Sequence, residues 1–401
     1  MEIPTFKREF IDRAIKKVNH SFYFYDLDQL KLQLNNWQKI LPDDITLWYA
    51  CKANPLSAVL KVFRNHGFGI DVASLGELDQ AMASGVKPEN ILATGPAKSK
   101  EYLRSMIDNE VGMIILESTS QAKWLNEAAA EASKKIKALI RVQLEWTEGE
   151  SVLGGKDITP FGEDESTWRT FNWRELEHLD ILGIHVFQWG NILDLSQLKS
   201  LWNEMATRCV QLANDMQLPL KLLDLGGGLG IPYEENQKPI SFYDVAKELF
   251  QLKKKFQLEN IYMELGRFAI GPYGHYLTRV IDRKTVRGKE LLVLEGGINH
   301  MVRPAITKQP FPSELYRQTD APLSTFQVHG PLCTALDKFG DYQLPNDIAP
   351  GDWMIFHQTG AYGFTESMPF FLCHSLPAEV ILYNDDLMIP RWPRPSIDWL
   401  V

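Results

Sequence analysis

Short hydrophobic runs alternate with amphipathic stretches from about residue 44 to about residue 267. The runs are nearly continuous, which is typical of parallel strands that are covered on both faces. The stretches between them carry helix signals: Ser74 and Glu77 are spaced as a capping box, and Gly85 is placed to end that helix. The pattern predicts strands at 45–51, 68–73, 90–94, 111–117, 136–144, 181–188, 220–225 and 261–265.

Eight β-then-α units in series predict a (β/α)8 barrel over residues 28–270, with an open doubly wound sheet as the alternative. After about residue 270 the helical periodicity fades. Strand-like segments at 276–280, 291–295, 324–328 and 353–356 then predict an antiparallel β-domain. The similar segment 21–27 precedes the barrel, so we assign residues 1–27 and 271–401 to this second domain. The long polar interval 145–179 predicts a mobile loop over the C-terminal mouth of the barrel.

Composition narrows the class of protein. The 401 residues are 45% hydrophobic and 23% charged, which excludes a largely disordered or fibrous chain. A net charge of -9 disfavours nucleic-acid binding, which needs a basic surface. No run approaches the roughly 18 apolar residues of a membrane span, and the first residues lack a signal-peptide pattern. The four cysteines have no C-x-x-C spacing, so we expect reduced thiols in a cytoplasmic protein and no metal site.

The candidate chemistry lies at the predicted C-terminal ends of the barrel strands, where barrel enzymes place their active sites. Lys52 follows the first strand and is suited to Schiff-base chemistry, although a lone lysine there is more often a surface residue. The glycine-rich turn 226–230 follows the seventh strand, where it could bind phosphate or simply form a tight turn. Glu264 and Arg267 end the eighth strand, a pairing that is usually structural.

Several motifs occur in the same order along the chain, and together they are a stronger functional signal than any one of them alone. Nearly the whole chain resembles the fold type III pyridoxal-phosphate enzymes, specifically the diaminopimelate/ornithine decarboxylase group. The matching motifs are YACKAN (49–54), DVAS (71–74) with GEL (76–78), GGGLG (226–230), ELGR (264–267), IN (298–299) with RPA (303–305), GPLC (330–333) and GAYG (360–363).

The resemblance implies a role for each motif. Lys52 would bind the aldehyde of pyridoxal 5'-phosphate, and Glu264 would pair with its pyridinium nitrogen. A carboxylate there keeps the ring a full electron sink, which favours decarboxylation over racemisation. Cys333 would come from the partner subunit of a homodimer and return a proton to Cα. The other implied cofactor contacts are Gly227, Gly228, Gly266, Arg267 and Tyr362 at the phosphate, with Asp71 and Arg141 on the cofactor face.

One departure from the family concerns the cofactor. The sixth strand of typical members carries a His-x-His-x-Gly-Ser type pattern, in which the second His stacks on the cofactor ring. Here Phe187 holds that stacking position, and an aromatic face can still pack on the ring without donating a proton. Trp189 and Gly190 replace the Gly-Ser pair, so one hydroxyl contact to phosphate is absent. Trp189 and Trp146 could reshape the pocket, or Trp146 could be ordinary packing.

A second departure concerns the substrate. Ornithine and diaminopimelate enzymes carry an acid directly after the catalytic Cys to bind a distal ammonium, whereas this chain has the uncharged Thr334. Arg303 keeps the position that grips a distal carboxylate. With Asp337 and the late segment 371–374, this pattern resembles the siderophore branch, namely the citryl-diaminopropionate decarboxylase of staphyloferrin B assembly and the vibrioferrin and achromobactin decarboxylases. We expect Arg303, Thr334, Asp337 and Tyr362 to contact substrate.

These patterns leave three functions to compare. The favoured one is pyridoxal-phosphate-dependent α-decarboxylation of a citrate-conjugated amino acid in carboxylate-siderophore biosynthesis. The alternative enzyme is a diaminopimelate or carboxynorspermidine decarboxylase. A regulatory homologue without activity is the non-enzyme alternative, and retention of both Lys52 and Cys333 argues against it.

Overall fold

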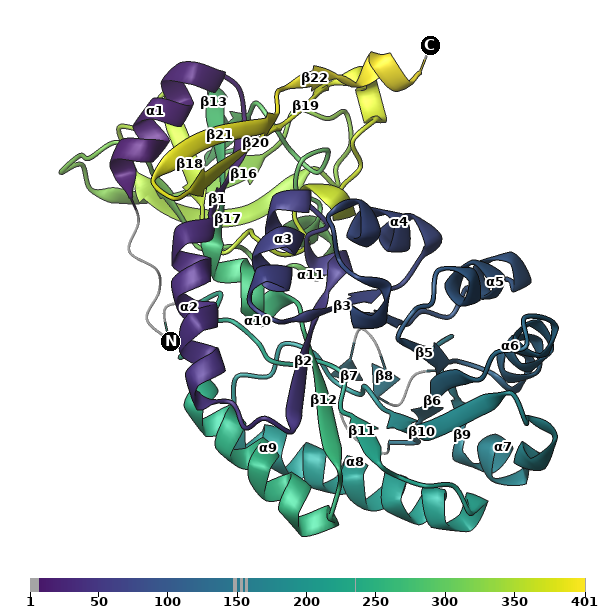
Figure 1. Ribbon diagram of the computed structural model, residues 1–401. Helices are drawn as coiled ribbons and strands as arrows, with labels where there is room; N and C mark the ends of the chain where they lie inside the picture. Colours follow the sequence, from purple (N-terminus) through teal and green to yellow (C-terminus); the bar gives the residue numbers. More distant parts are fainter. Residues whose placement is uncertain (1–6, 147–149, 152–153, 156–157, 235, 401) are drawn as a thin grey trace. The chain divides into compact units, whose positions relative to one another are not determined.

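The computed structural model describes residues 7–146, 150–151, 154–155, 158–234 and 236–400. These residues form two compact units (Figure 1). The first contains Gln33–Ile231 and Pro239–Phe268, and the second contains the N-terminal segment to Leu32, Pro232–Lys238 and Ala269–Val401.

The first unit is a closed parallel barrel of eight strands within the described residues. β10 pairs with β6, and β12 pairs with β2, so the sheet has no gap in its ring of strands. This confirms the barrel and excludes the open sheet. The strands are β2 (Ile45–Ala50), β3 (Gly69–Val72), β4 (Ile91–Ala93), β5 (Met113–Leu116), β6 (Ile136–Gln143), β10 (Leu179–His185), β11 (Leu222–Asp224) and β12 (Asn260–Leu265).

Helices follow the strands, as Figure 1 shows. Serine caps begin three of them, at Ser74, Ser99 and Ser118, where each hydroxyl accepts a backbone N–H. The capping box is shifted by one residue, because the Glu77 carboxylate accepts the N–H of Ala73. The helices are α2 (Leu27–Ile40), α3 (Ser57–Asn65), α4 (Leu75–Ala83), α5 (Lys100–Asp108), α6 (Thr119–Glu131), α7 (Glu165–Thr170), α8 (Leu195–Met216), α9 (Phe242–Phe256) and α10 (Arg267–Ile270), with 3-10 turns at Cys51–Ala53, Pro88–Asn90 and Trp173–Glu175.

Side chains fill the barrel. One buried cluster joins Trp48 to Leu92, Ile115 and Leu139 on neighbouring strands. Gly69 is required beside it, since a Cβ there would lie 2.2 Å from the Trp48 ring. The barrel is therefore a packed core, and chemistry is confined to its ends.

The interval 145–179 is only partly a loop, which corrects the prediction. β9 (Glu163–Asp164) pairs with the end of β6, and α7 follows at once. Trp168 of α7 is fully buried and donates its indole N–H to the backbone oxygen of Arg141. Buried aromatic area of this kind anchors residues 158–170 to the barrel. Short strands β7 (Glu150–Ser151) and β8 (Gly154–Gly155) pair with each other, and the rest of 147–157 lies outside the described residues.

The second unit is built on a mixed sheet, which corrects the antiparallel prediction. β1 runs parallel to β20, and β14 runs parallel to β16, while the other main pairs are antiparallel. The early segment joins this sheet through β1, which pairs with β13 and β20. The elements are α1 (Arg8–Val18), β1 (Phe22–Asp26), β13 (Gly274–Val286), β14 (Lys289–Leu294), α11 (Arg303–Thr307), β15 (Ser313–Leu315), β16 (Leu323–His329), β17 (Lys338–Pro345), β18 (Trp353–Phe356), β19 (Ser375–Leu376), β20 (Ala378–Tyr383), β21 (Asp386–Arg391) and β22 (Arg394–Pro395), with 3-10 turns at Gly271–Tyr273, Phe364–Glu366, Phe371–Cys373 and Ser396–Trp399.

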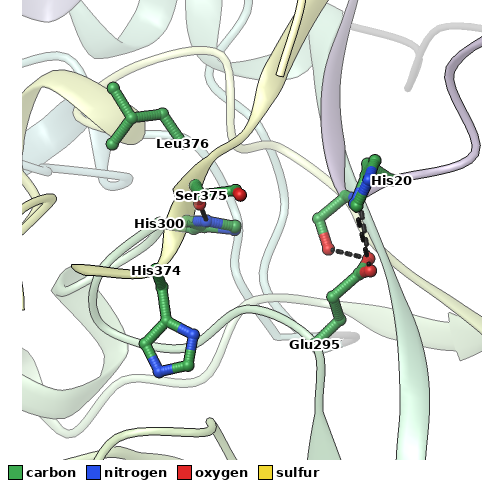
Figure 2. Close-up of a pocket in the computed structure, with 7 residues that line it drawn as sticks. His20, Glu295, His300, His374, Ser375 and Leu376 are labelled. Atoms are coloured by element: carbon green, nitrogen blue, oxygen red, sulfur yellow. Dashed lines mark hydrogen bonds and ion pairs between the residues drawn. The ribbon is translucent and has the colours of Figure 1, made fainter. Parts of the chain in front are cut away.

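A pocket of about 210 Å³ lies in this second unit (Figure 2). His300 lines it with both ring nitrogens engaged, Nδ1 with the Tyr276 hydroxyl and Nε2 with the Ser375 carbonyl oxygen. Burial lowers the pKa of His300 to about 4. The ring is therefore neutral at pH 7, and the carbonyl partner places its proton on Nε2. None of the predicted site residues lines this pocket.

Candidate active site

Ionisable side chains ring the C-terminal ends of the barrel strands. Asp71, Arg141, His185, Asp224 and Glu264 stand at or near the ends of five different strands, and each is buried. Lys52 follows β2 in the 3-10 turn Cys51–Ala53 and is exposed. Because parallel strands end on the same face of a barrel, one face collects all six groups.

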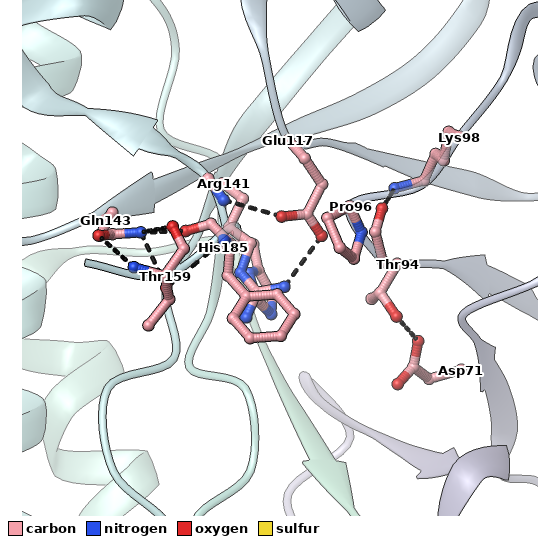
Figure 3. Close-up of polar contacts among 12 residues, drawn as sticks. Asp71, Thr94, Pro96, Lys98, Glu117, Arg141, Gln143, Thr159 and His185 are labelled. Atoms are coloured by element: carbon pink, nitrogen blue, oxygen red, sulfur yellow. Dashed lines mark hydrogen bonds and ion pairs between the residues drawn. The ribbon is translucent and has the colours of Figure 1, made fainter. Parts of the chain in front are cut away.

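Asp71 is held by the next strand. Its Oδ1 accepts a hydrogen bond of 2.6 Å from the Thr94 hydroxyl (Figure 3). Burial, together with the negative charge of Glu264, raises the pKa of Asp71 from 3.8 to about 7, and the positive charge of Lys52 opposes this. Asp71 can therefore take up or release a proton near neutral pH, as active-site carboxyls often do.

Arg141 forms a buried ion pair at the end of β6. Its Nη1 donates to Oε1 of Glu117 at 2.9 Å (Figure 3). The second Glu117 oxygen accepts the N–H of Gly162. Arg141 and Lys98 lower the pKa of Glu117 although burial opposes them. Burial lowers the pKa of Lys98 to about 8. A guanidinium held this firmly is a fixed positive charge at the mouth of the barrel.

Glu264 has a close partner of its own. Nε2 of His185 lies 3.1 Å from Oε1 of Glu264, and Asp224 stands on the strand between them. Burial raises the pKa values of both Glu264 and Asp224, and the positive charges of Lys52 and Arg141 oppose the rise for Glu264. Burial and the charge of Arg141 hold the pKa of His185 well below its usual range.

The glycine-rich turn lies against an aromatic ring. A Cβ on Gly226 would stand 2.7 Å from the Phe187 side chain, and one on Gly227 would stand 2.7 Å from the Glu264 carbonyl oxygen. Gly226 and Gly228 also have positive φ values of 61° and 112°. The turn therefore needs glycine for packing and backbone conformation, whatever it binds.

Four predicted barrel residues remain to be placed, namely Gly266, Arg267, Trp146 and Trp189. Gly266 and Arg267 follow β12, and Arg267 begins α10. Trp146 and Trp189 contact each other edge to face, with ring centroids 4.9 Å apart. Packing thus explains Trp146 at least in part.

Cys333 belongs to the second unit, where it is exposed. Thr334 follows it, and the N–H of Thr334 donates to the Leu332 carbonyl oxygen. Asp337 holds this loop: its two carboxylate oxygens accept the N–H groups of Ile298 and Leu332, each at 2.7 Å. Asp337 is only 1% exposed, and both of its carboxylate oxygens accept backbone N–H groups, so a direct contact with substrate stays a prediction. A buried carboxylate with two backbone donors shapes the loop that carries Cys333.

Arg303 has an ion-pair partner that the sequence did not predict. Its Nη1 donates to both oxygens of Glu366, at 3.0 and 2.8 Å. Its guanidinium also lies 4.9 Å from the centre of the Tyr362 ring. Tyr362 has a φ of 53°, a conformation that non-glycine residues seldom adopt and that often marks functional sites. All three residues belong to the second unit.

Sequence reasoning missed several polar groups at these sites. Glu117 ends the predicted strand 111–117, Asp224 is next to last in 220–225, and His185 lies in the second half of 181–188. A position in the later part of a predicted strand was therefore a signal that could have found them. Lys98 and Glu366 lie in or beside loops, and nothing in their local sequence marks them. Only the fold brings Lys98 near Glu117 and pairs Glu366 with Arg303.

Comparison with known proteins gives the family. Residues 27–271 match the model of the pyridoxal-dependent decarboxylases, in their pyridoxal binding domain. The chain belongs to the pyridoxal-dependent decarboxylases. It is therefore a pyridoxal-phosphate-dependent carboxy-lyase that acts on an amino acid.

Relatives of this family match most of the chain. It is 28% identical to the diaminopimelate decarboxylase of Aquifex aeolicus, over 97% of this chain and 93% of that protein. It is 29% identical to the 2-[(L-alanin-3-ylcarbamoyl)methyl]-2-hydroxybutanedioate decarboxylase of Staphylococcus aureus, over 90% and 93%. The crystal structure of diaminopimelate decarboxylase from Helicobacter pylori, complexed with L-lysine, shares the fold with a TM-score of 0.87 at 24% identity, over 97% of this chain and 98% of that one.

The barrel face fits the cofactor of this family. The close approach of Gly227 and Gly228 to neighbouring backbone leaves a turn without side chains, which suits a phosphate. A buried carboxylate, Glu264, and a nearby lysine, Lys52, supply the two groups that a pyridinium ring and an aldehyde require.

Proposed function

We propose that this carboxy-lyase removes the α-carboxylate of an amino acid that is already joined to citrate, in carboxylate-siderophore biosynthesis. The observation that carries the proposal is Thr334, an uncharged residue directly after Cys333 where an acid would bind a distal ammonium. A citryl amide has no such ammonium, because the distal nitrogen is acylated. The Staphylococcus aureus relative supports the proposal, since its name describes an alanin-3-yl group linked by a carbamoyl to a hydroxybutanedioate.

Each barrel residue has a proposed task toward pyridoxal 5'-phosphate. Lys52 holds the aldehyde carbon, Glu264 accepts the ring N–H, and Gly227, Gly228, Gly266 and Arg267 bind phosphate with Tyr362. When bound, the cofactor supplies an electron sink for the electron pair that CO2 loss leaves behind. Asp71 and Arg141 set the charge around the ring, and Phe187 packs on its face.

Arg303 is proposed to bind a remote carboxylate of the citryl group. In the second unit its guanidinium is paired with Glu366, which is 40% exposed in its side chain. The Arg303 side chain is 20% exposed, and a partly exposed ion pair contributes only modestly to stability, so a substrate carboxylate can displace Glu366 at modest cost. Tyr362, against the guanidinium face, keeps Arg303 in place during such an exchange.

Cys333 is proposed to protonate Cα after CO2 loss, acting from the partner subunit of a homodimer. Its exposed side chain, set in a loop held by Asp337, supports this role. Cys373 is the other exposed thiol of the described chain, whereas Cys51 and Cys209 are buried. Experiments that label Cys333 therefore need a Cys373→Ser background.

A diaminopimelate decarboxylase is the second candidate, and Glu366 is the observation that favours it. The Arg303–Glu366 pair offers one positive and one negative group together. Arg303 could bind the distal carboxylate of diaminopimelate and Glu366 its distal ammonium. Glu366 would then replace the acid that is missing at position 334. The Aquifex aeolicus relative also carries this activity in its name.

Substrate assays with two variants separate the candidates. We would measure CO2 release from the citryl-diaminopropionate conjugate and from diaminopimelate with wild type, Glu366→Gln and Thr334→Glu. For the citryl reaction, Glu366→Gln should keep or improve kcat/KM, and Thr334→Glu should lower it through repulsion of the citryl carboxylates. Wild-type turnover of diaminopimelate alone, abolished by Glu366→Gln, would reverse the choice.

A further inference from the structure

Three buried side chains from adjacent strands converge in the barrel. His185 ends β10, Asp224 ends β11, and Glu264 lies near the end of β12. They are 1%, 0% and 7% exposed, and one ligand atom from each lies within 4.8 Å of the other two. His185 and Asp224 are direct partners in the strand register. The implied roles of the family motifs use Glu264 and give no role to His185 or Asp224.

The imidazole of His185 is neutral and carries one proton. Burial and the positive charge of Arg141 both disfavour its charged form. Within the described chain Nδ1 has no hydrogen-bond partner, whereas Nε2 lies 3.1 Å from Oε1 of Glu264. A buried N–H without an acceptor is rarer than a buried acceptor without a donor. The proton therefore sits on Nε2 and is donated to Glu264.

Asp224 limits the negative charge in this cluster. Its Oδ1 accepts the N–H of Gly226 at 2.9 Å, and its Oδ2 has no hydrogen-bond partner in the part of the chain that the structure describes. Burial and the negative charge of Glu264 hold the pKa of Asp224 well above its usual range. Ionisation of Asp224 beside an ionised Glu264 is therefore disfavoured.

The two oxygens of Glu264 are thus distinguished. Oε1 accepts from His185, and within the described residues this is the one side-chain hydrogen bond found for Glu264. We propose that His185 is a positioning residue that holds the Glu264 carboxylate ionised and oriented, so that Oε2 is the atom presented to the ring nitrogen of the cofactor. This inference rests on the proposed role of Glu264.

A purely structural His185 would behave differently. It would stabilise the fold by filling space, and any residue of similar volume would serve. A positioning His185 acts through its N–H, so a substitute that keeps a donor at the same reach should restore function. His185→Leu removes the donor, and His185→Gln retains an N–H that can reach Glu264.

The experiment measures binding of pyridoxal 5'-phosphate, which does not depend on the identity of the substrate. Full-length cofactor-free protein is titrated with the cofactor, following tryptophan fluorescence and the absorption spectrum of the bound cofactor. His185→Leu should raise the dissociation constant roughly ten- to a hundredfold, the effect of losing one hydrogen bond to a charged group. The dissociation constant of His185→Gln should lie within about threefold of the wild-type value.

Two further variants complete the design. His178→Leu, which changes a half-buried histidine next to the start of β10, is the matched control and should bind cofactor like wild type. In a Glu264→Gln background, His185→Leu should add little, because the two residues act as one unit. If His185→Leu does not fold, His185→Asn replaces it, since its amide is too short to reach Glu264.

The outcomes separate the two proposals. The same cofactor affinity and spectrum in His185→Leu as in wild type would overturn the positioning role. So would equal losses in His185→Leu and His185→Gln, because filling space would then be the only role left. If Glu264→Gln alone left affinity and spectrum unchanged, the assignment of Glu264 would fail first. Tight binding of one Zn²⁺ by cofactor-free wild type, lost in His185→Leu, would also contradict the proposal, because the metal would occupy Nε2.

Discussion

Replacing Asp71 by Asn should stabilise the cofactor-free protein at high pH and lose this advantage at low pH. Asp71 is 1% exposed, and Asn keeps an oxygen that can accept the Thr94 hydroxyl. The substitution therefore removes ionisation while keeping size and the hydrogen bond. Its effect on stability should follow the protonation of Asp71 alone.

The magnitude follows from the shift in pKa. Burial raises the pKa of Asp71 from 3.8 to about 7. At about 1.4 kcal/mol per pH unit, this shift corresponds to about 4 kcal/mol of stability. The folded state binds the proton more tightly than the unfolded state, so this stability is complete below pH 3.8 and is lost as pH rises through 7. Roughly 2–3 kcal/mol of the loss falls between pH 5 and pH 8.

The assay is urea unfolding of cofactor-free wild type and Asp71→Asn at pH 5 and pH 8, followed by tryptophan fluorescence. The variant should gain stability relative to wild type between the two pH values. Asp79→Asn, an exposed change on α4, is the control and should show no such gain. In a Glu264→Gln background the gain should shrink, because the charge of Glu264 contributes to the shift. A difference between Asp71→Asn and wild type that is the same at both pH values would refute the reasoning.

Two other predictions test the dimer and the glycine turn. Mixing inactive Lys52→Ala and Cys333→Ala subunits should restore up to about one quarter of wild-type activity. Half of the dimers are then mixed, and each mixed dimer has one intact site out of two. No recovery of activity after verified subunit exchange would exclude a shared site. Gly227→Ala should weaken cofactor binding and lower the melting temperature, since its Cβ would stand 2.7 Å from the Glu264 carbonyl oxygen. The control Gly76→Ala, in an open position on α4, should be neutral or stabilising by about 1 kcal/mol, and equal losses in both variants would contradict the steric reasoning.

The barrel was predictable because hydrophobic runs record burial directly. Every predicted barrel strand overlaps an observed one, from 45–51 with β2 to 261–265 with β12. None of the described helices is long and apolar enough to cross a membrane. The direction of strand pairing in the second unit was not predictable, since neighbours in its sheet come from distant parts of the chain. β1 and β20 are parallel although more than 350 residues separate them.

Some candidate site residues could likewise be predicted from their position at the end of a hydrophobic run. Lys52 and Glu264 were found because a hydrophobic run stops beside each of them, whereas Asp71 and Arg141 came from the resemblance to the family. Their roles toward the cofactor stay predictions that the variants above test.

Tertiary structure decided the partners and the protonation of these groups. Sequence marked Asp337 as a substrate ligand, but only folding shows both of its oxygens accepting backbone N–H groups. Folding also pairs Glu366 with Arg303, across 63 residues of sequence, and His185 with Glu264, across 79. The physical reason is that a strand pattern reports only whether a side chain is buried. Which charge lies next to it, and therefore which of two neighbouring carboxyls keeps its proton, depends on distances that only the closed barrel sets.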